Sequence, residues 1–176
     1  MEDSLDILIS RLRDQKGKAF WQLLAEITRR REFHLVEERI FSAAGQADQD
    51  LGRRLEAARK AVAYGYTVYL LPNPQSIKSA DFIFERKGVY RLYELKTITG
   101  KNSVGNRLKE SSGQSNRVIL HITSKYNPRK LAEEIKKYYN SDPLAEEVLI
   151  FYKRKRSYIR RDSVTADLWR TLMSLF

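Results

Sequence analysis

Residues 81–97 have the sequence DFIFERKGVYRLYELKT, and this segment indicates two neighbouring strands joined by a turn. Asp81 to Phe84 is short, apolar and aromatic, which is typical of a strand. Lys87 and Gly88 supply a turn, and Val89 to Thr97 predicts a longer second strand. We therefore expect a hairpin that brings the start of the first strand beside the end of the second.

The charged residues at the open end of this hairpin indicate a metal site. Residues two apart on a strand point to the same face, so Glu94 and Lys96 project together. The hairpin makes Asp81 and Glu94 cross-strand neighbours, and like charges directly opposite repel unless a cation lies between them. Carboxylates suit a hard cation, so we predict Mg²⁺ or Mn²⁺. The metal would activate a water for phosphodiester hydrolysis, while Lys96 holds that water or stabilises the charge on phosphorus.

The rest of the sequence predicts a mixed α/β arrangement with a central sheet. Before the hairpin, the expected elements are helices around 5–12, 20–31, 34–44 and 50–64, a strand at 66–71 and a loop at 72–76. After it, the expected elements are helix 104–114, strand 117–123, helix 128–139, strands 148–152 and 157–160, and helix 166–176.

Composition favours a polyanionic partner. The 176 residues carry a formal net charge of +11, and cations that neutralise phosphates release condensed counterions. The absence of cysteine excludes disulfides, thiolate zinc sites and cysteine nucleophiles. The two histidines, His34 and His121, have no partner at zinc spacing, which argues against a histidine zinc site. No apolar run reaches transmembrane length and the start resembles no signal peptide, so we expect a cytoplasmic protein with no membrane partner.

Asp81, followed across a hairpin by Glu94-Leu95-Lys96, resembles the PD-(D/E)xK nuclease superfamily. The restriction-endonuclease-like core of that superfamily, α-β-β-β-α-β, has the same order as the elements expected over residues 50–123. Ala80 stands where the superfamily usually has Pro. The resemblance implies that Glu56, on the helix before the first of these strands, is a catalytic residue that approaches the metal.

Two later segments of the sequence are similar to one particular domain family. Residues 103–108, SVGNRL, and 114–120, QSNRVIL, are similar to the CdiA C-terminal tRNase domain, the toxin module of contact-dependent growth-inhibition proteins. This implies a tRNA-cleaving toxin, an acidic immunity protein as its inhibitor, and secretion or delivery if the chain is cut from a larger toxin. The residues that we expect to bind substrate are Thr97, Lys101, Asn106, Arg107 and Gln114.

We accordingly divide the chain into an N-terminal helical segment, residues 1–48, and a nuclease domain, residues 49–176. Two other interpretations stay open. A DNA endonuclease of the same superfamily would have the same site. A non-catalytic nucleic-acid-binding protein would carry Glu94 and Lys96 as an exposed ion pair of little consequence and would bind polyanions with or without EDTA.

Overall fold

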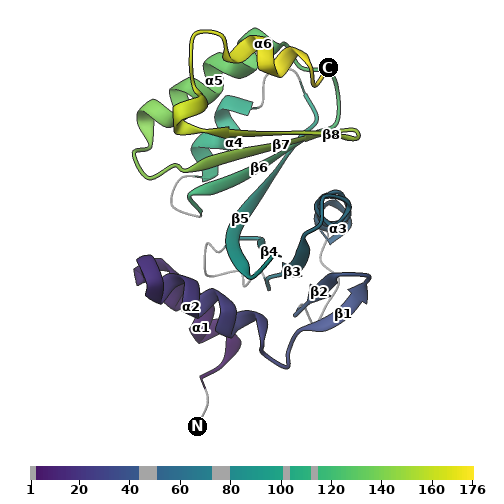
Figure 1. The fold of residues 1–176 in the computed structure, drawn as a ribbon, viewed down its shortest axis with the longest axis vertical. Coiled ribbons are helices and arrows are strands. Elements are labelled where there is room, and N and C mark those ends of the chain that lie inside the picture. Colours follow the sequence, from purple (N-terminus) through teal and green to yellow (C-terminus); the bar gives the residue numbers. More distant parts are fainter. Residues whose placement is uncertain (1–2, 44–50, 73–79, 101–103, 112–114) are drawn as a thin grey trace. The chain divides into compact units, whose positions relative to one another are not determined.

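The chain folds into two compact units, Met1–Tyr93 and Glu94–Phe176. They are seen in a computed structural model that describes residues 3–43, 51–72, 80–100, 104–111 and 115–176 (Figure 1). Hydrogen bonding links its strands in chain order, from β1 to β8. The mixed α/β class with a central sheet is therefore confirmed. The predicted boundary between residues 48 and 49 lies outside the described residues and stays a prediction.

The first unit combines helices with strands that pair in both directions. Its elements are α1 (Leu5–Arg11), η1 (Leu12–Asp14), α2 (Gly17–Thr28), β1 (His34–Glu37), β2 (Ile40–Ser42), α3 (Leu51–Ala63), β3 (Thr67–Leu70), β4 (Phe82–Arg86) and the start of β5 (Val89–Ile98). The pairing is antiparallel except between β2 and β3, which are parallel. The apolar sides of α1 and α2 share a core with Leu71 and Ile83.

The hairpin predicted over residues 81–97 is confirmed up to Tyr93. Phe82 pairs with Tyr93, and Arg86 pairs with Val89. Lys87 and Gly88 form the turn with φ values of 52° and 78°. A two-residue turn with positive φ at both positions matches the right-handed twist of the flanking strands. This local geometry explains why the hairpin could be predicted from the sequence.

The helix predicted over residues 34–44 is wrong. This region forms β1 and β2, joined by a turn in which Arg39 has a φ of 62°. Ile40 pairs with Val68 of β3 and is almost completely buried. The backbone of this segment is therefore satisfied by a strand that lies far along the chain, and such pairing overrides the local helical pattern. The predicted loop at 72–76 is described only at Pro72, and its other residues lie outside the described part.

The second unit continues β5 from Glu94 and adds α4 (Val104–Ser111), β6 (Arg117–Ile122), α5 (Pro128–Ser141), β7 (Glu147–Tyr152), β8 (Lys155–Arg160), η2 (Arg161–Ser163) and α6 (Leu168–Met173). β5, β6 and β7 are parallel, and β8 is antiparallel to β7. These elements match the predictions within a few residues.

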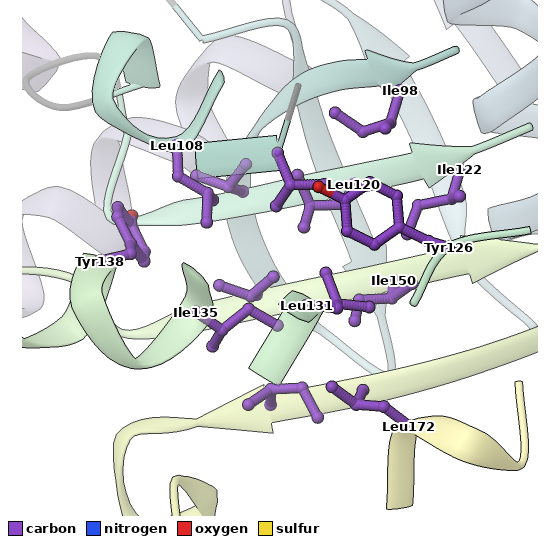
Figure 2. Packing of buried hydrophobic residues seen from close by; sticks show 14 of the residues in the cluster. Ile98, Leu108, Leu120, Ile122, Tyr126, Leu131, Ile135, Tyr138, Ile150 and Leu172 are labelled. Carbon is purple, nitrogen blue, oxygen red and sulfur yellow. The ribbon is translucent and has the colours of Figure 1, made fainter. Parts of the chain in front are cut away.

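Three helices cover one face of the strands β6 to β8 (Figure 1). Figure 2 shows Leu108 of α4, Leu131 and Ile135 of α5, and Leu172 of α6 directed toward Leu120 and Ile150 of the sheet. Every second residue of a strand points to the same face, which is why β6 contributes Val118, Leu120 and Ile122 to this core. α4 packs against both α5 and β6, so this core fixes its position in the second unit.

None of the helices in the described part of the chain combines the length and apolarity of a membrane span.

Candidate active site

Glu94 and Lys96 form a paired and largely buried group on β5. Lys96 Nζ lies 2.9 Å from Glu94 Oε1, and the two side chains are 14% and 4% exposed. Both belong to the part of β5 that pairs in parallel with β6, where Glu94 lies opposite Val118 and Lys96 lies opposite Leu120. Their alternation along the strand puts them together as the sequence predicted. Because the pair is buried, the interpretation as an exposed, solvated ion pair does not apply.

The helix α4 adds a second acid and a second base to this group. Lys96 Nζ lies 3.9 Å from Glu110 Oε2, and Arg107 Nη1 lies 3.2 Å from the same oxygen. Arg107 and Glu110 are three residues apart, which makes them neighbours on a helix surface. Glu110 was not among the site residues predicted from the sequence. An acid three residues after a candidate phosphate-binding arginine, on the helix that follows the site strand, is the signal that could have found it.

Asp81 lies in the first unit, where backbone contacts hold it at the start of β4. Its N–H donates to the carbonyl of Tyr93, at 3.0 Å. Its carboxylate Oδ1 lies 3.9 Å from Nε of Arg54, and its side chain is 20% exposed. In the sequence, Tyr93 directly precedes Glu94.

Arg54 is a buried cation on α3 that was not among the predicted site residues. It is 3% exposed and donates to the carbonyl oxygens of Leu71 and Asp81. The pattern of α3 contains the signal, because Arg54 shares a helix face with the buried Ala57, Ala58 and Ala61. A long side chain on that face has to enter the interior of the unit. Arg54 therefore ties the end of β3 to the start of β4.

Glu56 is exposed on α3. It follows Arg54 by two residues, which is about 200° around a helix, so the two side chains leave on different faces. Hydrogen bonding to Glu37 raises the pKa of Arg59, and the charge of Glu56 adds to that shift. Burial lowers the pKa of Lys60, and Glu56 opposes that shift. The electrostatic effect of Glu56 thus falls on its own helix, and its role near a metal stays a prediction.

The predicted substrate-binding residues are placed as follows. Thr97 is half-buried on β5 and pairs with His121 of β6, while Asn106 and Arg107 are exposed on α4. Lys101 and Gln114 lie outside the described residues. Within the described ranges, no group of three or more His, Asp or Glu side chains could hold a metal ion. The metal site expected from Asp81 and Glu94 stays a prediction; carboxylate oxygens of this kind suit Mg²⁺ and Mn²⁺ chemically.

The second unit is thus a mixed α/β assembly that carries a buried acid–base pair on β5, which pairs in parallel with β6. Part of the chain is similar to a known family. Residues 78–156 match the family model for the contact-dependent growth inhibition CdiA C-terminal domain. The match covers less than half of the chain and includes Asp81, Glu94 and Lys96. It confirms over this range the similarity to the CdiA C-terminal domain, while the PD-(D/E)xK assignment stays a prediction.

A solved structure, the CdiA-CT/CdiI toxin and immunity complex from Burkholderia pseudomallei, is also similar to this chain. The sequence identity is 21% and the TM-score is 0.46, over 66% of this chain and 91% of that chain. No curated protein matches the sequence.

Proposed function

We propose that this chain is a metal-dependent nuclease of the toxin type, and that it hydrolyses phosphodiester bonds, with tRNA as the favoured substrate. The observation that carries the proposal is the buried Glu94, held 2.9 Å from Lys96. Removing two charges from water costs several kcal/mol per ion before their attraction offsets it, so a fold has little structural reason to keep such a pair. The CdiA C-terminal match over residues 78–156 and the net charge of +11 support the same function.

In this proposal, Asp81 and Glu94 are the carboxylate ligands of Mg²⁺ or Mn²⁺, as in the PD-(D/E)xK superfamily, and Glu56 assists. A bound cation of this kind polarises a phosphoryl oxygen and lowers the pKa of a water. Lys96 holds a water or a phosphate oxygen through its N–H donors. The short contact with Glu94 fixes the ammonium in place, so Lys96 needs no reorganisation when the substrate arrives.

Substrate binding is proposed for Thr97, Lys101, Asn106, Arg107 and Gln114. Basic and small polar side chains position a nucleic acid through its phosphates and carry little sequence information. The choice of tRNA over DNA therefore rests on the similarity of residues 78–156 to the CdiA C-terminal domain. The same similarity supports an acidic immunity protein as partner and action in the cytoplasm of a cell that the toxin reaches.

A cleavage assay tests this function. The purified protein is incubated with bulk tRNA and with plasmid DNA, side by side, with Mg²⁺ and with EDTA. We expect cleavage of tRNA with Mg²⁺ only. Lys96→Ala should slow cleavage by about 100-fold or more, since loss of one donor to a developing charge has that effect. Lys125→Ala, which changes an exposed lysine of the same unit, is the matched control and should keep the wild-type rate.

The alternative outcomes separate the remaining hypotheses. Wild-type cleavage by a folded Lys96→Ala variant contradicts the mechanism. Cleavage of plasmid DNA alone assigns the chain to the DNA endonucleases. Salt-dependent binding of both nucleic acids, without cleavage and unaffected by EDTA, shows a binding protein instead.

A further inference from the structure

One carboxylate oxygen of Glu110 lies between two cations of the second unit. Glu110 Oε2 is 3.2 Å from Arg107 Nη1 and 3.9 Å from Lys96 Nζ. Arg107 and Lys96 come from different elements, α4 and β5. An oxygen anion shared by an arginine and a lysine is the arrangement that a phosphate oxygen takes when these residues bind it.

The parts of this arrangement differ in how freely they can move. The Glu94 and Lys96 side chains are 4% and 14% exposed and hold each other at 2.9 Å. The Arg107 and Glu110 side chains are 45% and 53% exposed. The inner side of α4 is anchored by the buried Leu108, which points into the core in Figure 2, and by the buried Ser111. Glu110 can therefore turn away into solvent without a change in the helix, while Lys96 stays in place.

We propose that Glu110 is an internal stand-in for a substrate phosphate, and that it sets the affinity of this site for nucleic acid. The carboxylate holds Lys96 and Arg107 in a phosphate-binding arrangement, and an incoming phosphodiester replaces it. The substrate class rests on the proposed nuclease function. The competition itself depends only on the distances around Glu110 Oε2.

The replacement is energetically accessible. Ion pairs between half-exposed side chains are weak because water screens them and because both side chains lose rotamer freedom. A nucleic acid brings many phosphates at once and releases counterions on binding, so it competes well against a single carboxylate. The cost of displacing Glu110 then appears as a weaker observed affinity. Removal of the charge should strengthen binding by about two- to fivefold, which corresponds to an exposed ion pair.

The test measures binding of labelled bulk tRNA by fluorescence anisotropy in EDTA, so that no metal-dependent cleavage intervenes. Glu110→Gln removes the charge and keeps the size of the side chain. Glu133→Gln makes the same change of net charge at an exposed position of α5 in the same unit. We expect Glu110→Gln to bind about two- to fivefold more tightly than Glu133→Gln, and the difference to shrink as salt is added. Equal affinities of the two variants would overturn the proposal.

A second pair of variants tests whether the two cations carry the effect. In an Arg107→Ala background, Glu110 has lost its nearer partner, so Glu110→Gln should give a smaller gain. A gain of undiminished size in that background also overturns the proposal.

The outcome separates this inference from the nuclease function. If the Glu110→Gln gain is seen but tRNA stays intact with Mg²⁺, the nuclease function fails and the phosphate stand-in survives. If tRNA is cleaved but Glu110→Gln and Glu133→Gln bind it equally, only the present proposal fails.

Discussion

The two units each bury a charged side chain to the same degree, but with opposite sign and different partners. Arg54 in the first unit and Glu94 in the second are both 3% exposed. Arg54 donates to the backbone carbonyls of Leu71 and Asp81. Glu94 contacts the ammonium of Lys96, which lies nearer the surface.

This difference separates a structural charge from a chemical one. Carbonyl groups at the ends of strands need a donor whatever the protein does, so Arg54 serves the fold. Glu94 is paired instead with the side chain of Lys96, at 2.9 Å. Glu94 therefore contributes little stability that a well-packed apolar residue could not, and we infer that its role is chemical.

The largest expected effect concerns the activity carried by Glu94. Glu94→Gln should reduce Mg²⁺-dependent cleavage by about 100-fold or more, because a neutral amide replaces a carboxylate that ligates the cation. The measurement is the initial rate of tRNA cleavage. Thermal unfolding should show a folded protein, since the amide can still accept a hydrogen bond from Lys96.

Glu147 is the matched control within the same unit. It is 2% exposed and its Oε2 lies 3.3 Å from Nε of Arg117, so it is another buried carboxylate with a basic partner. Glu147→Gln should lower the free energy of unfolding by about 2 kcal/mol and leave the cleavage rate of the folded protein unchanged. If Glu94→Gln and Glu147→Gln behave alike in both measurements, Glu94 is structural and the comparison with Arg54 breaks down.

The next effect concerns stability in the first unit. Arg54→Met keeps much of the apolar stem but leaves the carbonyls of Leu71 and Asp81 without this donor, so the free energy of unfolding should fall by about 3 kcal/mol. Arg53→Met, at the exposed neighbouring position of α3, should change it by less than about 0.5 kcal/mol. Chemical denaturation measures both. Equal effects would show that Arg54 does not tie β3 to β4.

These two charges also show what the sequence could predict about the site. Glu94 and Lys96 follow from the two-residue period of a strand, which depends only on neighbours along the chain. The contacts of Arg54 and Glu110 depend on how a helix face meets strands that are distant in sequence. Arg54 reaches the carbonyls 17 and 27 residues away in the chain. Such contacts cannot be predicted without the tertiary structure, although the pattern of α3 indicates that Arg54 faces the interior.

The fold shows the same division. The turn at Lys87 and Gly88 was predictable because its positive φ angles are a local property of the hairpin. The strands β1 and β2 were mistaken for a helix because Leu35, Val36 and Ile40 fit a helical spacing. Pairing of Ile40 with Val68, 28 residues later, decided the outcome. Local pattern alone could not supply that pairing.

A pH titration extends the comparison to a neutral buried group of the second unit. Burial raises the pKa of Tyr138 to about 12, and nearby acids such as Asp142 add to the shift. An unfolded tyrosine loses its proton near pH 10.0, whereas folded Tyr138 keeps its proton up to about pH 12. The contribution of Tyr138 to the free energy of unfolding is therefore full below pH 10 and is lost as the pH rises through about 12. We expect a loss of about 3 kcal/mol over that range. Unfolding midpoints at several pH values measure it, and Tyr138→Phe should be less sensitive to pH.

The smallest expected effect tests whether the charge of Arg54 is the reason for its contribution to stability. Tyr139 of the second unit also satisfies a backbone carbonyl, because its hydroxyl donates to the oxygen of Ile159 in the interior, but this donor is neutral. Tyr139→Phe should lower the free energy of unfolding by about 1 kcal/mol, the usual contribution of a neutral hydrogen bond. Tyr90→Phe, at a half-buried position on β5, serves as the control.

The effects of Tyr139→Phe and Arg54→Met on the free energy of unfolding are to be compared as a ratio. If Tyr139→Phe costs about a third as much as Arg54→Met, the additional cost in the first unit comes from the charge of Arg54 and from the second carbonyl that it holds. Equal costs would show that satisfying one buried carbonyl is what matters in both units, and that the charge of Arg54 contributes nothing measurable. In that case the contrast between the units would rest on Glu94 alone, because of Arg54 and Glu94 only Glu94 would have a role that depends on its charge.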